Sequence, residues 1–153
     1  NGADGNPGND ASRPFATIAK GLSMCAKGDT VIVQALEMAA TDTDPGSYAE
    51  TVTMSVPQVS LIGVSRGRTQ GGLPQMKIGA GSTAMITVAA PGCYIANMGI
   101  NGATSTGGGI KLDDDGGSTK AAFGTTIENC HFKNCKCHAT NGTLGGAIYW
   151  AEF

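Results

Sequence analysis

Hydrophobic residues in this chain gather in short runs separated by Gly, Pro, Asn and Asp. Runs of three to seven β-branched or other apolar residues between turn residues predict strands. We predict strands at 30–34, 49–54, 59–64, 76–78, 85–88, 94–100, 110–112, 126–132 and 147–150. The Asn-Gly pairs at 101–102 and 141–142 each lie well before the next apolar run, so tight hairpins are not expected.

One segment near the N-terminus has a different period. Apolar residues recur there at intervals of three and four, at Phe15, Ile18, Leu22 and Cys25. This spacing predicts one face of a helix. Pro14 suits a first helical turn, and Gly28 suits the positive φ that often follows a helix. We therefore predict a helix over about 14–26.

Two sequence motifs repeat in the same order along the chain. Segments 95–101 and 127–133 share the pattern apolar-x-Asn-apolar-x-apolar at a spacing of 32, and segment 59–64 fits its apolar positions at a spacing of 36. Gly-Gly-Gly-Ile at 107–110 and Gly-Gly-Ala-Ile at 145–148 repeat at a spacing of 38. Repeats of this length, each with several short strands, predict a solenoid in which every coil contacts only its neighbours.

The repeated motif also predicts a corner. Apolar residues alternate up to Asn97, skip once, and resume in the opposite register from Met98. A chain with this pattern bends between the two residues, so that both short strands face one interior. An Asn at such a corner can hydrogen-bond to an Asn one coil away, and Asn97 over Asn129 is the predicted pair. The alternative is two unrelated surface Asn residues.

Composition limits the protein classes. Charged residues make up 14% of the chain and the net charge is −2, so a nucleic-acid partner is not expected. The longest uncharged stretches are interrupted by polar residues and turn formers, so no membrane insertion is expected. The 24 Gly residues have no three-residue period, which excludes collagen, and an apolar fraction of 41% argues against disorder. Five Cys, an odd number, argue against a disulfide framework.

Several segments together resemble a known family. These are Asp4–Asn9, Arg13–Ile18, Lys27–Val33, Gly46–Val52 and Val59–Gly63. They resemble the N-terminal part of the pectate-lyase-like right-handed parallel β-helix superfamily, in which a short amphipathic helix caps the open end of the solenoid. The resemblance covers about 4–64 and continues as generic coils over 93–150. Around 35–45 this chain inserts about ten residues where relatives pass directly into a Gly-Thr-Tyr turn.

We therefore predict an all-β fold, a right-handed parallel β-helix of three to four coils with a short capping helix. Residues 1–28 form the predicted arm and capping helix, and residues 29–153 form the coils. Val31 and Val33 should lie inside the first coil. The helix residues expected to cover that coil are Phe15, Ile18 and Leu22.

The acidic cluster Asp113–Asp115 is the first candidate for chemistry. Lyases of the superfamily resemble one another in a Ca²⁺ site beside an Arg or Lys base. Consecutive strand residues point to opposite faces, so at most two of these carboxylates could meet one ion, and Ca²⁺ takes six or more oxygens. A turn is the favoured interpretation and a cation site the alternative. Arg13, Arg66 and Arg68 all lie outside the predicted strands.

The glutamates do not form a predicted catalytic pair. A glycoside hydrolase needs two or three carboxylates across one groove, whereas the four Glu residues are scattered over the chain. They are Glu37, Glu50, Glu128 and Glu152. Glu128 should point outward if Ile127 and Asn129 point inward. We assign no catalytic, cofactor-binding or metal-binding residue and expect no cofactor.

A cluster of thiols and imidazoles follows the last predicted corner. Its members are Cys130, His131, Cys135, Cys137 and His138. Zinc needs four ligands at tetrahedral positions. Cys130 and Cys135 occupy apolar positions of the repeat, where a free Cys packs as a small hydrophobic residue. Core cysteines are favoured, with a metal site or a local disulfide as alternatives.

Three classes of function remain. The favoured one is a non-enzymatic virion component, a phage tailspike, fibre or particle-decoration protein that supports the particle or attaches to a host-surface glycan. The alternatives are the N-terminal part of an extracellular polysaccharide lyase or glycoside hydrolase, and a bacterial surface adhesin, since coils 130–135 and 145–149 also resemble those of β-helical adhesins. All three imply a virion, extracellular or cell-surface location.

The two ends of the sequence give further expectations. The chain does not start with Met, so we expect the N-terminus to be processed or internal. Segment 145–153 is typical of the start of a coil, and an open parallel strand exposes unpaired backbone groups. We expect the chain to continue past Phe153, or a partner subunit to cover this edge, in a homotrimer or with other virion subunits.

Overall fold

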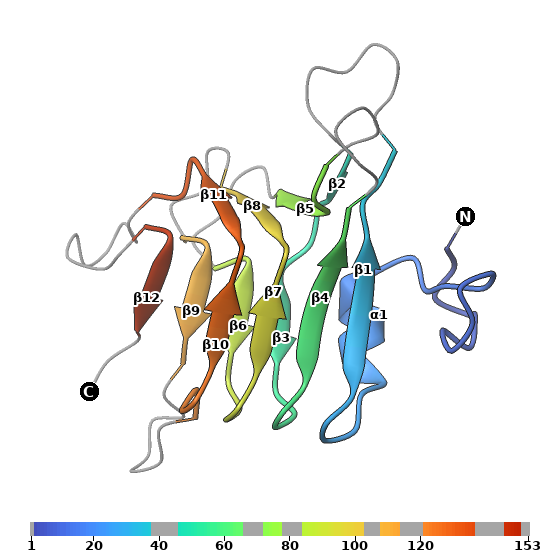
Figure 1. The fold of residues 1–153 in the computed structure, drawn as a ribbon, viewed down its shortest axis with the longest axis horizontal. Coiled ribbons are helices and arrows are strands. Elements are labelled where there is room, and N and C mark those ends of the chain that lie inside the picture. The colour runs from blue at the N-terminus through green and yellow to red at the C-terminus, as the bar shows by residue number, and fades with distance from the viewer. Residues whose placement is uncertain are drawn as a thin grey trace.

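The computed structural model describes residues 2–37, 46–65, 72–77, 84–102, 108–113, 121–136 and 146–150. These residues form one short helix and a series of short strands (Figure 1). The elements are α1 (Ile18–Ser23), β1 (Thr30–Gln34), β2 (Ser47–Tyr48), β3 (Val52–Met54), β4 (Ser60–Val64), β5 (Gln75–Lys77), β6 (Ile86–Val88), β7 (Tyr94–Ala96), β8 (Gly99–Asn101), β9 (Ile110–Leu112), β10 (Thr126–Glu128), β11 (His131–Lys133) and β12 (Ile148–Trp150).

The strands form three parallel sheets that wind around one core. Their orders are β1-β4-β7-β10, β2-β5-β8-β11 and β3-β6-β9-β12, so every third strand joins the same sheet. Three successive strands make one coil, and we number the coils 1 to 4 from β1–β3 to β10–β12. In Figure 1 the strands β1, β4, β7 and β10 lie side by side along the long axis. The predicted right-handed parallel β-helix of three to four coils is confirmed, with four coils in the described residues.

The register between coils confirms two of the three predicted spacings. Ile95 pairs with Ile127 and Ile110 with Ile148, at the predicted spacings of 32 and 38. The predicted spacing of 36 is wrong, because Leu61 pairs with Ile95, a spacing of 34. Val59 and Leu61 both face the core, and a shift of two residues keeps the same face inward. The apolar pattern therefore could not distinguish between them.

The strand boundaries follow the predicted corners. The predicted runs 94–100 and 126–132 each divide into two strands around an Asn, as the predicted bend requires. The predicted run 49–54 shortens to β3, and the stretch 36–47, interpreted as a loop, ends in the unpredicted β2. Tyr48 of β2 donates a hydrogen bond from its hydroxyl to the Gln34 carbonyl, 2.8 Å away. Most of the predicted insertion lies outside the described residues.

The capping helix is shorter than predicted. It begins at Ile18 rather than Pro14 and ends at Ser23. Thr17 is extended and caps the helix, with its hydroxyl accepting from the Lys20 N–H at 3.1 Å. The Asp4 carboxylate accepts the backbone N–H groups of Ala16 and Thr17 at 2.9 and 3.0 Å. These bonds hold the chain before Ile18 out of the helix, because a carboxylate from the arm takes the donors.

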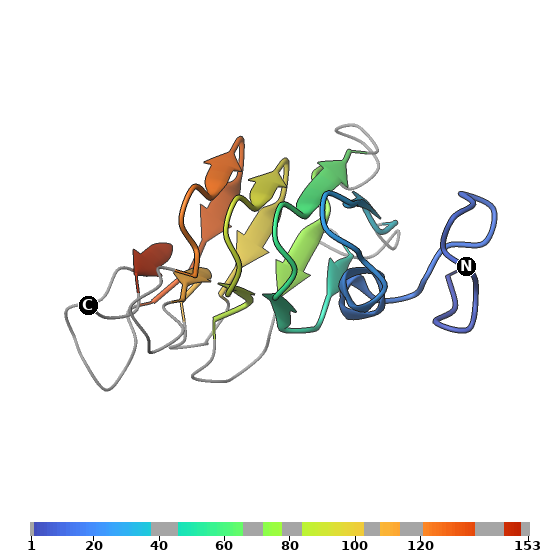
Figure 2. The same ribbon diagram turned by 90° about the horizontal axis from the view of Figure 1, so that it is seen from below.

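Two helix residues cover the first coil. Ile18 and Leu22 are 3% and 7% exposed, and α1 contacts β1 and β3. Phe15 is not among the covering residues as predicted. It precedes the helix, and its ring packs over Gly8 and beside Gly21. In Figure 2, α1 lies at the end of the stack next to coil 1.

Gly28 has the predicted positive φ, 88°, but not the predicted role. It lies in the turn before β1, and Met24 is the C-cap of the helix. Within the described residues α1 is the one helix, and nothing there has the length and apolar character of a membrane-spanning helix.

The core runs the length of the stack, with burial that changes along it. Val33 is buried and Val31 is half-buried inside coil 1, as predicted. In coil 3, Ile95 and Met98 are 0% exposed. The inward residues of coil 4, which are Ile127, Cys130, Phe132 and Cys135, are only half-buried. Among the described residues the core is therefore covered by α1 at one end and exposed at coil 4.

Candidate functional site

Glu50 is committed to the start of the capping helix. It lies between β2 and β3, and its carboxylate accepts the N–H groups of Ile18 at 2.8 Å and Ala19 at 2.9 Å. A carboxylate at this position satisfies two unpaired helix donors and complements the positive end of the helix dipole. The sequence held no local signal for this contact, because Glu50 is about thirty residues from the helix.

Replacing Glu50 with Ala should lower the free energy of unfolding by about 1–2 kcal/mol, as the loss of a helix N-cap typically does. Urea titration followed by circular dichroism measures the change. Glu37→Ala is the matched control, because Glu37 is exposed and should leave the midpoint unchanged. Equal midpoints for the two variants would show that the Glu50 contact contributes no stability.

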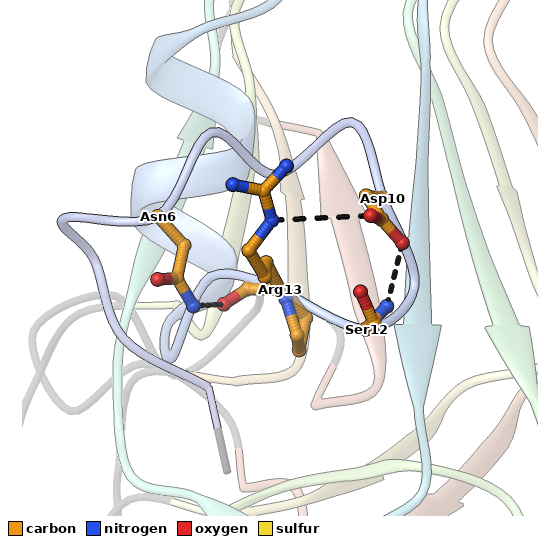
Figure 3. Close-up of polar contacts among 5 residues, drawn as sticks. Asn6, Asp10, Ser12 and Arg13 are labelled. Atoms are coloured by element: carbon orange, nitrogen blue, oxygen red, sulfur yellow. Dashed lines mark hydrogen bonds and ion pairs between the residues drawn. The ribbon is translucent and has the colours of Figure 1, made fainter.

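The N-terminal arm holds Arg13 in a local turn (Figure 3). Its Nε lies 3.9 Å from Asp10 Oδ2, and both side chains are largely exposed. The N–H and hydroxyl of Ser12 lower the pKa of Asp10, and Asn6 donates to the Pro14 carbonyl at 2.8 Å. Arg13 therefore lies outside the strands, as predicted, and stabilises the arm. Arg66 and Arg68 lie outside the described residues.

Asp113 is the one member of the acidic cluster within the described residues. Its Oδ1 lies 2.8 Å from Lys111 Nζ, and its backbone N–H donates to the Val88 carbonyl. An ion-paired carboxylate at the end of β9 has a structural role. Asp114 and Asp115 lie outside the described residues, so the choice between a turn and a cation site at the full cluster stays a prediction.

Cys130 and Cys135 are free thiols packed against the core, in the apolar positions that the repeat predicted. Burial raises the pKa of both thiols. They do not form the local disulfide considered as an alternative. Cys137 and His138 lie outside the described residues. Within the described part of the chain, no three His, Cys, Asp or Glu side chains are grouped as metal ligands would be.

The predicted Asn pair is confirmed at the corner between β7 and β8. Asn129 Nδ2 donates to Asn97 Oδ1 at 2.6 Å, and both residues have positive φ, 47° and 58°. Asn tolerates this left-handed conformation better than most residues. The pair therefore joins the corners of coils 3 and 4.

A second Asn pair was not predicted. Asn134 Nδ2 donates to Asn101 Oδ1 at 3.3 Å, and Asn101 is 4% exposed. The sequence repeat hid this pair, because its members are 33 residues apart while the strands repeat at 32. Coil 4 has one extra residue at this second corner. Asn101 also belongs to an Asn-Gly pair that we had considered as a turn signal.

Replacing Asn129 with Ala should destabilise the protein by about 1–2 kcal/mol, through the lost hydrogen bond and the strain of positive φ. Asn129→Gly separates the two causes, because glycine adopts this φ without strain but cannot form the bond. Chemical denaturation of both variants should rank them Ala below Gly below the unchanged protein. A Gly variant as stable as the unchanged protein would contradict a contribution from the amide bond.

Polar side chains gather on the outer surface beside the first Asn pair. Tyr94 donates from its hydroxyl to Glu128 Oε2 at 3.0 Å, and this bond raises the pKa of Tyr94. Glu128 is exposed, as predicted, and His131 is exposed on the next strand. We call Tyr94, Asn97, Glu128, Asn129 and His131 the outer corner cluster. It offers a phenol ring, amides, a carboxylate and an imidazole, groups that can hydrogen-bond to a polyhydroxylated ligand.

The outer corner cluster is poorly suited to hydrolysis. Glu128 is its one carboxylate, and glycoside hydrolysis uses two carboxyl groups on either side of the bond that breaks. Other carboxylates of the described residues, those of Asp4, Asp10, Glu50 and Asp113, are engaged in the structural contacts above. The arrangement supports binding better than catalysis.

Comparison with protein-family models, with curated proteins and with solved structures finds no match to this chain. The parallel β-helix is therefore established by the strand pairing alone.

Proposed function

We propose that this chain is the β-helical part of a non-enzymatic virion component, a phage tailspike, fibre or particle-decoration protein, within the pectate-lyase-like superfamily. It serves as a stiff support or attaches the particle to a host-surface glycan. The observation that carries the proposal is the assignment of the described acidic side chains to structural contacts, which leaves stacked coils without a catalytic pair.

The stacking of the coils supports a mechanical role. All strand pairs in the described residues are parallel and in continuous register, and two Asn pairs join adjacent corners. A solenoid bound together in this way resists bending, because each coil is hydrogen-bonded to the next along three sheets. Such a rod suits a fibre or spike.

The outer corner cluster supports an attachment role. It brings an aromatic ring and several hydrogen-bonding groups to the exposed surface of coils 3 and 4. Sugars are bound in proteins through hydroxyl hydrogen bonds and through packing on aromatic rings. A neutral or weakly polar surface glycan is the ligand that this chemistry fits.

The test incubates the protein with a panel of bacterial surface polysaccharides and polyuronates, and measures binding and release of cleaved sugar separately. We expect saturable binding to at least one glycan, weakened by Tyr94→Ala and by Glu128→Ala, with no cleavage. Lys27→Ala is the control, because Lys27 is exposed near coil 1, far from the cluster in sequence.

The opposite result is equally specific. Cleavage of an acidic glycan that Asp114→Ala abolishes would contradict the proposal and favour the alternative of an extracellular polysaccharide lyase or glycoside hydrolase. Binding to protein receptors but to no glycan would favour the surface-adhesin alternative.

A further inference from the structure

Coil 4 exposes a face that matches the surfaces buried between the other coils. We call Ile127, Cys130, Phe132 and Cys135 the terminal face, and all four are half-buried against the core. The corresponding positions of coil 3, such as Ile95 above Ile127 and Ile100 above Phe132, are 0% and 1% exposed. In the described residues, the terminal face is thus a coil-to-coil surface without a covering coil.

The hydrogen bonds of coil 4 also continue the pattern in one direction. β10, β11 and β12 are each the last strand of their sheet, so each has one free edge. Asn129 and Asn134 donate through Nδ2 toward coil 3. Each amide then keeps its Oδ1 as the acceptor for a further donor on the side away from coil 3.

The other end of the molecule excludes one occupant. Coil 1 is covered by α1, which is fixed by Glu50 and Asp4 through the bonds to its first residues. A second copy therefore cannot place its own coil 1 on the terminal face. The occupant must instead supply extended backbone, apolar side chains and an amide donor at the corner.

We infer that the terminal face docks a partner subunit through a strand–corner–strand segment with the pattern apolar-x-Asn-apolar-x-apolar. The segment adds in parallel to β10 and β11, its backbone pairs with their free edges, and its Asn donates to Asn129 Oδ1. Its apolar side chains cover Ile127 and Phe132. The inference rests on the proposed function only in placing the chain within a larger assembly.

The probe is a fluorescent peptide that copies 94–102 of this chain, Tyr-Ile-Ala-Asn-Met-Gly-Ile-Asn-Gly, with two added lysines for solubility. This segment already pairs with β10 and β11 in the native stack, so it carries the required pattern. Fluorescence anisotropy should show saturable binding. A peptide with Leu in place of its first Asn should bind about threefold to tenfold more weakly, the effect of one lost hydrogen bond.

A second control removes a backbone donor from the peptide and leaves the protein unchanged. The Gly99 N–H donates to the Pro74 carbonyl of the preceding coil at 2.9 Å. Sarcosine at that peptide position lacks the N–H, so its binding should also weaken by about threefold to tenfold. This control keeps the inference testable where a protein variant fails to fold.

Protein variants then locate the binding site. Ile127→Lys should abolish peptide binding, whereas Thr126→Lys should preserve it, because Thr126 is exposed and neighbours Ile127 on the same strand. Absence of binding at millimolar peptide, or equal binding by all three peptides, would overturn the inference. Concentration-dependent self-association in light scattering, abolished by Ile127→Lys, would also overturn it by assigning the face to a second copy.

These outcomes are separate from the glycan test. The glycan assays probe Tyr94 and Glu128 on the outer surface, whereas the peptide assays probe inward residues of coil 4. Peptide binding without glycan binding would retain the docking site and remove the attachment role, and the reverse result would remove the docking site alone.

Discussion

Replacing Gly63 with alanine should lower the free energy of unfolding by about 3 kcal/mol, at the upper end of the usual cost of overpacking a core. For a chain of this length the melting temperature should fall by about 6–12 °C. A Cβ at Gly63 would overlap the carbonyl oxygen of Asn97 and lie 2.7 Å from Pro74 Cγ. Both neighbours are fixed, one as backbone and the other as a ring, so the added methyl group has no low-energy position.

The reason for this crowding lies in the shapes of coils 2 and 3. β4 continues straight through Gly63 to Val64, whereas coil 3 turns at Asn97. The corner of one coil therefore presses its carbonyl against the strand of the coil before it. Gly5→Ala is the matched control, because a Cβ at Gly5 would meet nothing within 4 Å. Equal melting temperatures for the two variants would refute the steric argument.

Ile95→Ala should destabilise the protein by about 3–4 kcal/mol, because Ile95 is fully buried and its loss leaves a cavity. Ile127→Ala makes the same chemical change one coil away and should reduce the free energy of unfolding by only about 1–2 kcal/mol, since Ile127 is half-buried. Denaturant titration of both variants measures the difference. Equal losses would mean that Ile127 is as well covered in solution as Ile95.

The strands and most of their register could be predicted because the coils repeat. Each strand depends on residues within it and on a similar strand about 32–38 positions away, and both leave a pattern in the sequence. The prediction was wrong where two registers bury the same face, as with Val59 and Leu61. It also missed the pair of Asn101 and Asn134, because one extra residue breaks the strict period.

The start of the helix was less predictable for a different reason. Its first residue depends on carboxylates of Asp4 and Glu50 that reach it from the arm and from the segment before β3. Apolar periodicity reports which face is buried, but not which backbone donors a distant side chain takes. For the same reason, the structural roles of Glu50 and of Tyr94 with Glu128 had no signal in the sequence.

The difference between the two ends of the stack gives the molecule a direction in local opening. Coil 1 is held by α1, and coils 2 and 3 each have hydrogen-bonded neighbours on both sides. Coil 4 has such a neighbour on one side within the described residues, so separating it breaks one set of interstrand bonds instead of two. Transient opening of the isolated chain should therefore proceed from coil 4 toward the helix, like a zipper with one fixed end.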